Sequence, residues 1–475
     1  MKDHILFLTG KLAEKSLRRV LDAMQPQEFT WEVRQLGLSV AALMTADLIR
    51  RRLGETGNAT RVIVPGLCRG DLDRLTREFG IPVVRGTDDL KDLPAFFGRD
   101  CKPPDLSRYD VRIFAEIVDA PEIDTDTILE RAAALVADGA NVIDIGCLPD
   151  TPFPHMEEAI AALRSRGYEV SIDSVDPGDL LRGARAGAAY LLSLSAETLH
   201  LAEEVEAVPV LIPERPGDMD SLYRAIDTLA AAGQRFIADS VLDPIHFGFA
   251  ESLCRYGELR RRYPEVEIMM GTGNLTELTE ADTTGINALL FGIISELRIT
   301  NVLTTQVSPH ARCVVRESDR ARRIMYAARA EQGLPKGLDG GLASLHERKP
   351  FVFSEQEVRE LAEQIRDPNY RVQVTEAGIH VFNRDGMHTG EDPFELFPAL
   401  AQLRGDAPHA FYLGVELARA QIAWRLGKRY VQDRELDWGV AVHGAEADDR
   451  NNEAFKPAGP TLEAARAERR RNGGK

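Results

Sequence analysis

The sequence is poor in cysteine and in positive charge, and it contains no long apolar run. Its five cysteines are scattered and form no CxxC pair, which argues against a disulfide framework or a structural zinc site and suits a reducing, cytoplasmic compartment. No stretch approaches the ~18 consecutive apolar residues of a membrane span. The 58 basic residues are outnumbered by 75 acidic ones, and a net charge of −17 argues against nucleic acid or an anionic membrane as partner.

What is present is the composition of a globular α/β protein with several domains. The chain has 475 residues, of which 44% are hydrophobic, and this length suggests about three domains. Residues 1–108 alternate strand and helix signals and predict a small α/β domain with a parallel sheet, ending near the stiff Lys102-Pro103-Pro104 segment. Residues 109–333 form the central domain, 350–444 predict a C-terminal α+β domain, and 445–475 predict a flexible polar tail.

The central region has the regular alternation of a closed barrel. Eight apolar strands and eight helical stretches follow one another from Tyr109, which is the number that a (β/α)8 TIM barrel requires. The helical stretches include Ala196–Glu204 and Leu275–Leu297. An open doubly wound sheet fits less well, because it would have fewer strands and one reversal of strand order. The predicted strands are Val111–Val118, Asn141–Gly146, Glu169–Ser174, Tyr190–Ser195, Val208–Pro213, Phe236–Val241, Glu267–Gly273 and Ile299–Thr304.

Polar residues follow many of these strands, and the stretch YEVSIDS, residues 168–174, shows the pattern best. It reads as a buried strand that ends in Asp173. In a barrel the carboxyl ends of the strands carry the chemistry, and several acids that converge there indicate a polar ligand, although a single one can be an ordinary helix cap. The predicted tip residues are Glu116, Asp119, Asp144, Asp173, Ser193, Ser195, Glu214, Asp239, Asp243, Asn274, Arg298, Thr300 and Asn301.

Two tip residues have less direct interpretations. Arg298 is the obvious fixed positive charge of the set, and its planar fork suits a phosphate or diphosphate. Cys147 follows the second strand, but no side chain that would activate a thiol is evident, so it is interpreted as a small buried residue.

Four motifs in order resemble the pterin-binding barrels, above all dihydropteroate synthase. They are GANVIDIGCLPDTP, EVSIDSVDPGDLLRGARAGA, FIADSVLDPIHFGF and ELRITNV, and together they span less than half of the chain. The flanking domains look like those of the archaeal and methylotroph dihydropteroate-synthase-related proteins, which are associated with making tetrahydromethanopterin. The resemblance therefore implies a TIM barrel that binds a pterin.

The resemblance also implies a reaction and a set of residues. The reaction condenses a dihydropterin-methyl diphosphate with an arylamine, here a ribofuranosyl-aminobenzene phosphate, and releases diphosphate with the help of Mg²⁺. Asp173 and Asp243 match the acids that hold the pterin ring, and Arg298 matches the arginine near the diphosphate, so these three form the expected catalytic set. The expected substrate-binding residues are Asp119, Asp144, Ser193, Asn274, Thr300 and Asn301. A homodimer is expected by the same analogy.

The chain departs from that family at several tips, and the departures leave two alternatives open. Asp150 and Thr151 stand where the family has Thr-Arg, GTGNLTE replaces Ser-Arg-Lys, and Thr300 replaces the last-strand histidine. Asn274 resembles the asparagine of pterin-dependent methyltransferases, which is the first alternative. The missing basic residues favour the second alternative, a non-catalytic pterin-binding scaffold.

Overall fold

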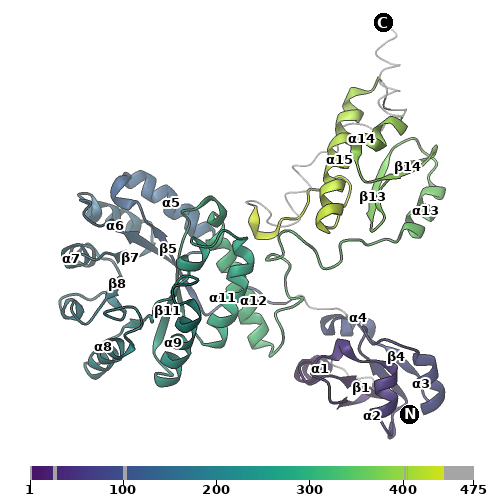
Figure 1. The fold of residues 1–475 in the computed structure, drawn as a ribbon, viewed down its shortest axis with the longest axis horizontal. Helices are drawn as coiled ribbons and strands as arrows, with labels where there is room; N and C mark the ends of the chain where they lie inside the picture. Colours follow the sequence, from purple (N-terminus) through teal and green to yellow (C-terminus); the bar gives the residue numbers. More distant parts are fainter. Residues whose placement is uncertain (1–2, 25–28, 100–103, 401–402, 404, 443–475) are drawn as a thin grey trace.

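The structure, a computed structural model, describes residues 3–24, 29–99, 104–400, 403 and 405–442. Figure 1 shows three α/β bodies joined by extended segments, and the largest is a ring of helices around strands. The predicted tail, 445–475, and the start of the predicted break, Lys102-Pro103, lie outside the described residues. Within the described residues, no helix has the length and apolar character needed to cross a membrane.

The N-terminal body contains the parallel sheet that the alternation predicts. Its four strands pair in the order β2-β1-β3-β4, and helices pack on both faces over separate apolar clusters. The strands are β1 (Asp3–Thr9), β2 (Phe29–Gln35), β3 (Arg61–Val64) and β4 (Val83–Arg85). The helices are α1 (Glu14–Ala23), α2 (Ala46–Arg52), α3 (Leu72–Phe79) and α4 (Leu93–Phe96).

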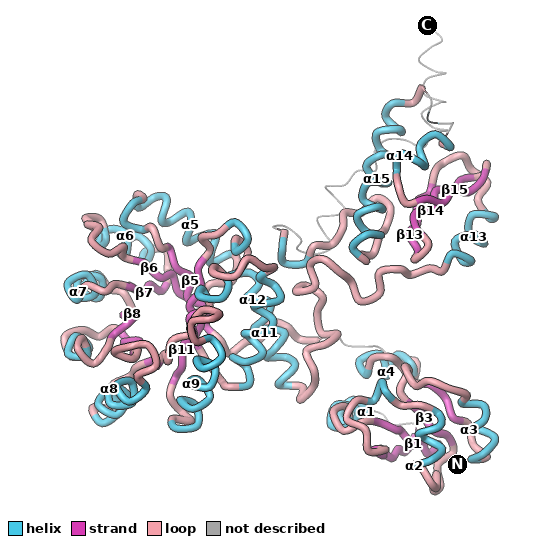
Figure 2. The backbone as a smooth tube through the Cα atoms, viewed as in Figure 1, coloured by secondary structure: helices cyan, strands magenta, loops and turns pink. Residues whose placement is uncertain are grey.

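The central body is the predicted closed barrel of eight parallel strands, in the order β10-β11-β12-β5-β6-β7-β8-β9. Figure 2 shows the helices arranged around the strands, with the other two bodies beside α11 and α12. The strands are β5 (Arg112–Ile117), β6 (Val142–Gly146), β7 (Glu169–Asp173), β8 (Tyr190–Leu194), β9 (Val208–Leu211), β10 (Ile237–Ala238), β11 (Glu267–Gly271) and β12 (Asn301–Thr305). The main helices are α5 (Thr125–Ala137), α6 (Met156–Ser165), α7 (Pro177–Ala186), α8 (Met219–Ala231), α9 (Phe249–Arg262), α11 (Thr283–Glu296) and α12 (Val314–Ala330).

Two helical predictions differ from the structure. The helix predicted over Ala196–Glu204 is a short 3-10 segment, Leu199–Glu203. The long helix predicted over Leu275–Leu297 is interrupted, and a short helix α10 (Gly273–Thr276) precedes α11. The interruption has a tertiary cause, because the carboxylate of Glu277 accepts hydrogen bonds from the backbone N–H groups after β12 and holds the chain there.

The C-terminal body has the predicted α+β character. Its antiparallel sheet runs β13-β14-β15 and packs against α15, with a core of aliphatic and aromatic side chains. A turn at Arg384-Asp385 joins β14 to β15, and Gly386–Gly390, which we expected to be a turn, forms the strand β15. The elements are α13 (Glu355–Gln364), β13 (Arg371–Thr375), β14 (Gly378–Asn383), β15 (Gly386–Gly390), α14 (Pro393–Leu396) and α15 (Ala407–Leu426).

A buried arginine attaches the last helix of the barrel to the starts of its first two strands. We call the amino ends of the strands the foot of the barrel and the carboxyl ends its mouth. At the foot, Arg322 of α12 is 2% exposed and donates hydrogen bonds to the carbonyls of Val111 and Gly139, to the side-chain oxygen of Asn141 and to Asp319. The last helix is thereby fastened to the entries of the first two strands.

Replacing Arg322 with alanine should therefore destabilise the barrel by about 3–5 kcal/mol, because it leaves buried acceptors without a donor. Arg185→Ala is the matched control. Arg185 forms an exposed ion pair with Glu204, with 3.5 Å between the nitrogen and the oxygen, and its removal should cost less than about 1 kcal/mol of stability. Urea unfolding followed by circular dichroism measures both variants. Equal small losses in the two would contradict the role given to Arg322.

Candidate functional site

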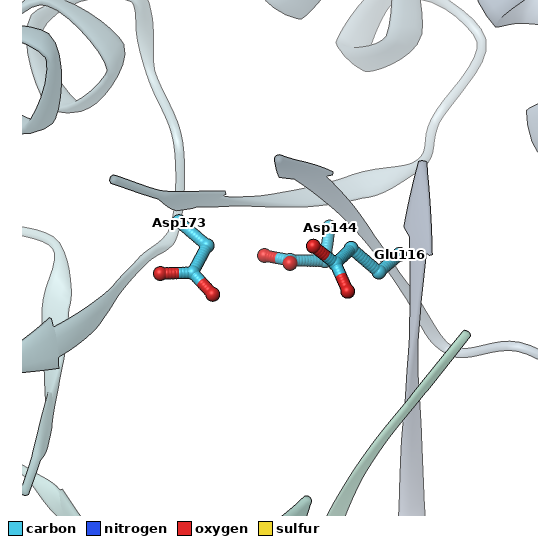
Figure 3. A group of neighbouring side chains, drawn as sticks. All are labelled: Glu116, Asp144 and Asp173. Carbon is cyan, nitrogen blue, oxygen red and sulfur yellow. The ribbon is translucent and has the colours of Figure 1, made fainter. Parts of the chain in front are cut away.

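Three acidic side chains from neighbouring strands meet at the mouth of the barrel. Glu116 of β5, Asp144 of β6 and Asp173 of β7 place carboxylate oxygens within 4.8 Å of one another, and Figure 3 shows them entering the same space. The parallel register produces this meeting, because it sets Glu116 opposite Asp144 and Gly146 opposite Asp173. We call these three residues the acidic triad.

Asp144 occupies the most buried position of the acidic triad. Its side chain is fully buried, and the hydroxyl of Ser171 donates to Oδ1, while Oδ2 has no hydrogen-bond partner among the described residues. Gly146, two residues further on, leaves room for the carboxylate of Glu116, because a Cβ there would lie 2.8 Å from Oε1 of Glu116. The sequence NVIDIG therefore supplies both the acid and the space in which a second acid approaches it.

Burial and mutual repulsion raise the pKa values of the acidic triad. Burial, followed by the charge of Asp173, raises the pKa of Glu116 to about 7. Burial, followed by the charges of Asp173 and Glu116, raises the pKa of Asp144 well above its usual range. Burial also raises the pKa of Asp173, although a hydrogen bond from Ser193 opposes that effect. Carboxylates that share a site in this way hold protons at neutral pH or require a positively charged or donor-rich ligand.

Ser193 reaches Asp173 because β8 is irregular. The pairing of β8 with β9 shifts between Leu191 and Leu194, and Ser193 has a backbone φ of 72°, in the left-handed region. Such backbone strain in a residue other than glycine is common at functional sites. The distortion gives the predicted substrate-binding residue Ser193 its contact with the acidic triad.

A second group of acids lies across the barrel from the acidic triad, around β10. Asp239 accepts hydrogen bonds from Tyr256 and from the backbone of Val241, and burial raises its pKa to about 6. Asp243 in the following loop is paired with Arg255 of α9 at 2.6 Å. The structure thus supplies Asp243 with a basic partner that sequence reasoning missed, because the arginine lies twelve residues downstream on a helix.

The remaining mouth residues are tied to protein groups. Asn274, the second residue of α10, donates from Nδ2 to the carbonyl of Leu242 at 2.7 Å, so it adjoins the loop that carries Asp243. Asp119 follows β5 but accepts two hydrogen bonds from Arg131 of α5, at 2.7 and 2.9 Å. Asn274 therefore belongs with the β10 group, whereas Asp119 is turned to a helix.

Three predicted site residues lie at the other end of the barrel. α11 ends at Glu296, the chain turns at Arg298 with a φ of 55°, and β12 begins only at Asn301, which pairs with Arg112 at the start of β5. Thr300 is bonded to the carbonyl of Ile268 and Asn301 to Thr300. The expectation that Arg298, Thr300 and Asn301 line the mouth is therefore corrected, because the arginine precedes the strand and the foot lies a full strand away from the mouth.

The true tip of β12 carries residues that the sequence did not single out. Thr305 pairs with Glu116, and the following residue is Gln306. Thr305 Oγ1 and Gln306 Nε2 are both buried and have no hydrogen-bond partner among the described residues. The polar run TTQ at the end of this apolar strand could have identified these residues in the sequence. We overlooked it because none of the three side chains is charged.

Exposed apolar side chains follow several strands at the mouth of the barrel. They belong to the loops after β7, β10 and β12 and to the segment after α10, and we call them the apolar rim. Its members are Val175, Ile245, Phe247, Leu278 and Val307, with exposed fractions from 41% to 81%. The arrangement of a polar floor under apolar walls is typical of sites for flat heterocyclic ligands.

Comparisons with known proteins match different parts of the chain. Residues 3–88 match a family of unknown function, DUF6513. An uncharacterized protein of Methanocaldococcus jannaschii, MJ0107, is 26% identical over an alignment of 525 positions, which covers 91% of this chain and 98% of that protein.

Solved structures of dihydropteroate synthases are also similar to part of the chain. The enzyme of Thermus thermophilus in complex with 6HMPPP is 19% identical, over 47% of this chain and 95% of its own, with a TM-score of 0.37. The enzyme of Coxiella burnetii in complex with pteroic acid is 16% identical, over 46% of this chain and 94% of its own, with a TM-score of 0.38.

Replacing Glu116 with glutamine should stabilise the protein at alkaline pH. The pKa of Glu116 is raised in the folded state, so the folded protein binds more protons between pH ~4.5 and ~7, and stability falls as the pH rises through that window. The variant should gain about 1–3 kcal/mol at pH 8 and nothing near pH 4. Urea unfolding at a series of pH values measures the difference, with the exposed Glu122→Gln as control. A gain that is independent of pH would contradict the assignment.

Cys147 should behave as an inert thiol. Burial raises its pKa to about 12, with a smaller effect of the charge of Asp179, so the reactive thiolate is scarce at neutral pH. Iodoacetamide at pH 7.5 should alkylate the exposed Cys254 well before Cys147, as peptide mass spectrometry would show. Preferential modification of Cys147 would indicate an activating environment.

Proposed function

We propose that this protein is a dihydropteroate synthase-like transferase whose barrel mouth binds a dihydropterin. The observation that carries the proposal is the convergence of Glu116, Asp144 and Asp173 at the mouth of a closed eight-stranded barrel. Asp144 and Asp173 lie in two of the four motifs that resemble pterin-binding barrels, and both stand at the end of the barrel where such enzymes hold their ligands.

The chemistry of the floor matches the edge of a pterin. The pyrimidinone edge of this heterocycle offers neighbouring N–H donors, and an ionised carboxylate accepts two of them side by side. Asp173 is suited to this role, because the hydroxyl of Ser193 favours its ionised form against the effect of burial on its pKa. Asp243 and Asn274 are proposed to complete recognition from the β10 side, where Arg255 holds Asp243 in place.

The proposed reaction joins the methylene carbon of a dihydropterin-methyl diphosphate to the nitrogen of an arylamine. The C–N bond forms as the C–O bond to diphosphate breaks, and the amine nitrogen loses a proton. A ribofuranosyl-aminobenzene phosphate is the proposed amine, in a pathway to a tetrahydromethanopterin- or folate-type cofactor. The apolar rim would hold the aromatic part of that amine above the floor.

Diphosphate release from the dihydropterin substrate tests the proposal. Asp173→Asn should lower the rate by about 10²-fold or more, because the ring would lose the carboxylate that orients it. Arg298→Ala is the matched control and should leave the rate unchanged, since that side chain belongs to the foot. Equal losses in the two variants would contradict the placement of the site.

A negative result would discriminate among the remaining candidates. Absence of diphosphate with either p-aminobenzoate or the ribosylated amine would reject the synthase. Methyl transfer from a reduced pterin to an added corrinoid protein would then favour a methyltransferase, which the position of Asn274 at the tip of β11 supports. Tight dihydropterin binding without any turnover would favour a scaffold.

A further inference from the structure

The acidic triad differs from Asp119 and Asp243 because no basic side chain among the described residues forms an ion pair with it. Asp119 is paired with Arg131, and Asp243 is paired with Arg255. Among the described residues, no lysine, arginine or histidine forms an ion pair with Glu116, Asp144 or Asp173. Three carboxylates within contact distance therefore face one another with only hydroxyl groups to stabilise their charge.

Within the acidic triad, Asp144 has a buried carboxylate oxygen that lacks a hydrogen-bond partner among the described residues. This oxygen is Oδ2. Asp144 is 0% exposed, and one of its carboxylate oxygens lies within 4.8 Å of oxygens of Glu116 and Asp173. Burying an unsatisfied carboxylate oxygen costs free energy unless a proton or a cation occupies its vicinity. On the neighbouring strand, the buried Oγ1 of Thr305, the partner of Glu116 in the register, is unsatisfied as well.

We propose that the acidic triad binds one divalent cation of the Mg²⁺ or Mn²⁺ class. Hard cations of this class take oxygen ligands at about 2.0–2.2 Å in octahedral geometry, so ligand oxygens lie up to roughly 4.2 Å apart. The three carboxylate oxygens already lie within 4.8 Å, and small side-chain rotations bring them to that spacing. Three carboxylates fill half of the octahedron and leave the other positions for water or for an oxygen-bearing ligand.

This cation site goes beyond the proposed transferase function and does not depend on it. It would supply positive charge at the mouth, where the sequence led us to expect Arg298. An anionic group such as a diphosphate would otherwise approach three carboxylates, which repel it. Each carboxylate gives the cation one oxygen, so with the cation bound Asp173 keeps one oxygen for a single N–H donor of the organic ligand, in place of the two donors that the free carboxylate could accept.

Direct binding of Mn²⁺ and Mg²⁺ to the full chain, treated with EDTA and desalted, tests the proposal. The electron paramagnetic resonance signal of free Mn²⁺ should fall with a stoichiometry of one per chain. Calorimetric titration with Mg²⁺ at pH 7.5 should give the same stoichiometry of one per chain. Both measurements are independent of any catalytic activity.

Variants locate the cation. Asp144→Asn and Glu116→Gln should each weaken Mn²⁺ binding by about 100-fold or more. Glu122→Gln removes an exposed acid from the same end of the barrel and should leave binding unchanged. Because the two triad variants lie on different strands, either suffices if the other fails to fold, as judged by circular dichroism. The proposal would be overturned if Mn²⁺ up to ~1 mM failed to bind at pH 7.5. It would also be overturned if the triad variants bound Mn²⁺ as tightly as the native protein.

Discussion

The pairing of β12 with β5 is the constraint on which the rest of the barrel depends. It runs in register from Asn301 opposite Arg112 to Thr305 opposite Glu116, and so turns a sheet with two edges into a closed cylinder. Closure removes unpaired strand edges and fixes which residues face inward at each level. One register therefore determines both the packing at the foot and the polar floor at the mouth.

The two ends of this cylinder handle charge in opposite ways. At the foot, Arg112 contacts Tyr190 and Glu169, and Arg322 is bonded to four surrounding acceptor groups, so each buried charge has partners. At the mouth, Glu116, Asp144 and Asp173 repel one another, and two of their neighbours leave polar atoms unsatisfied. The protein has therefore concentrated like charges at the mouth, where a ligand can relieve their repulsion.

The sequence predicted the barrel and part of its floor for a clear physical reason. Buried parallel strands are short apolar runs, and Asp144 and Asp173 interrupt or end such runs, so both the strands and these acids could be recognised. Arg298 was misplaced because the resemblance of ELRITNV to the family's last-strand motif led us to count it as a tip residue, although it precedes the predicted strand Ile299–Thr304. In the structure it likewise lies before β12, at the foot. The partners Arg255 and Thr305 were missed because tertiary contacts alone bring them to the site.

The apolar rim has a consequence for how the acids beneath it act. In the open site, Val175, Phe247 and Val307 are exposed to solvent. A flat molecule lying across the opening would displace water and lower the local dielectric, so the attraction between floor and ligand would grow at the moment of occupancy. Because the ligand would close the opening against the apolar rim, the electrostatic attraction between the acids and the ligand would reach its full strength only in the complex.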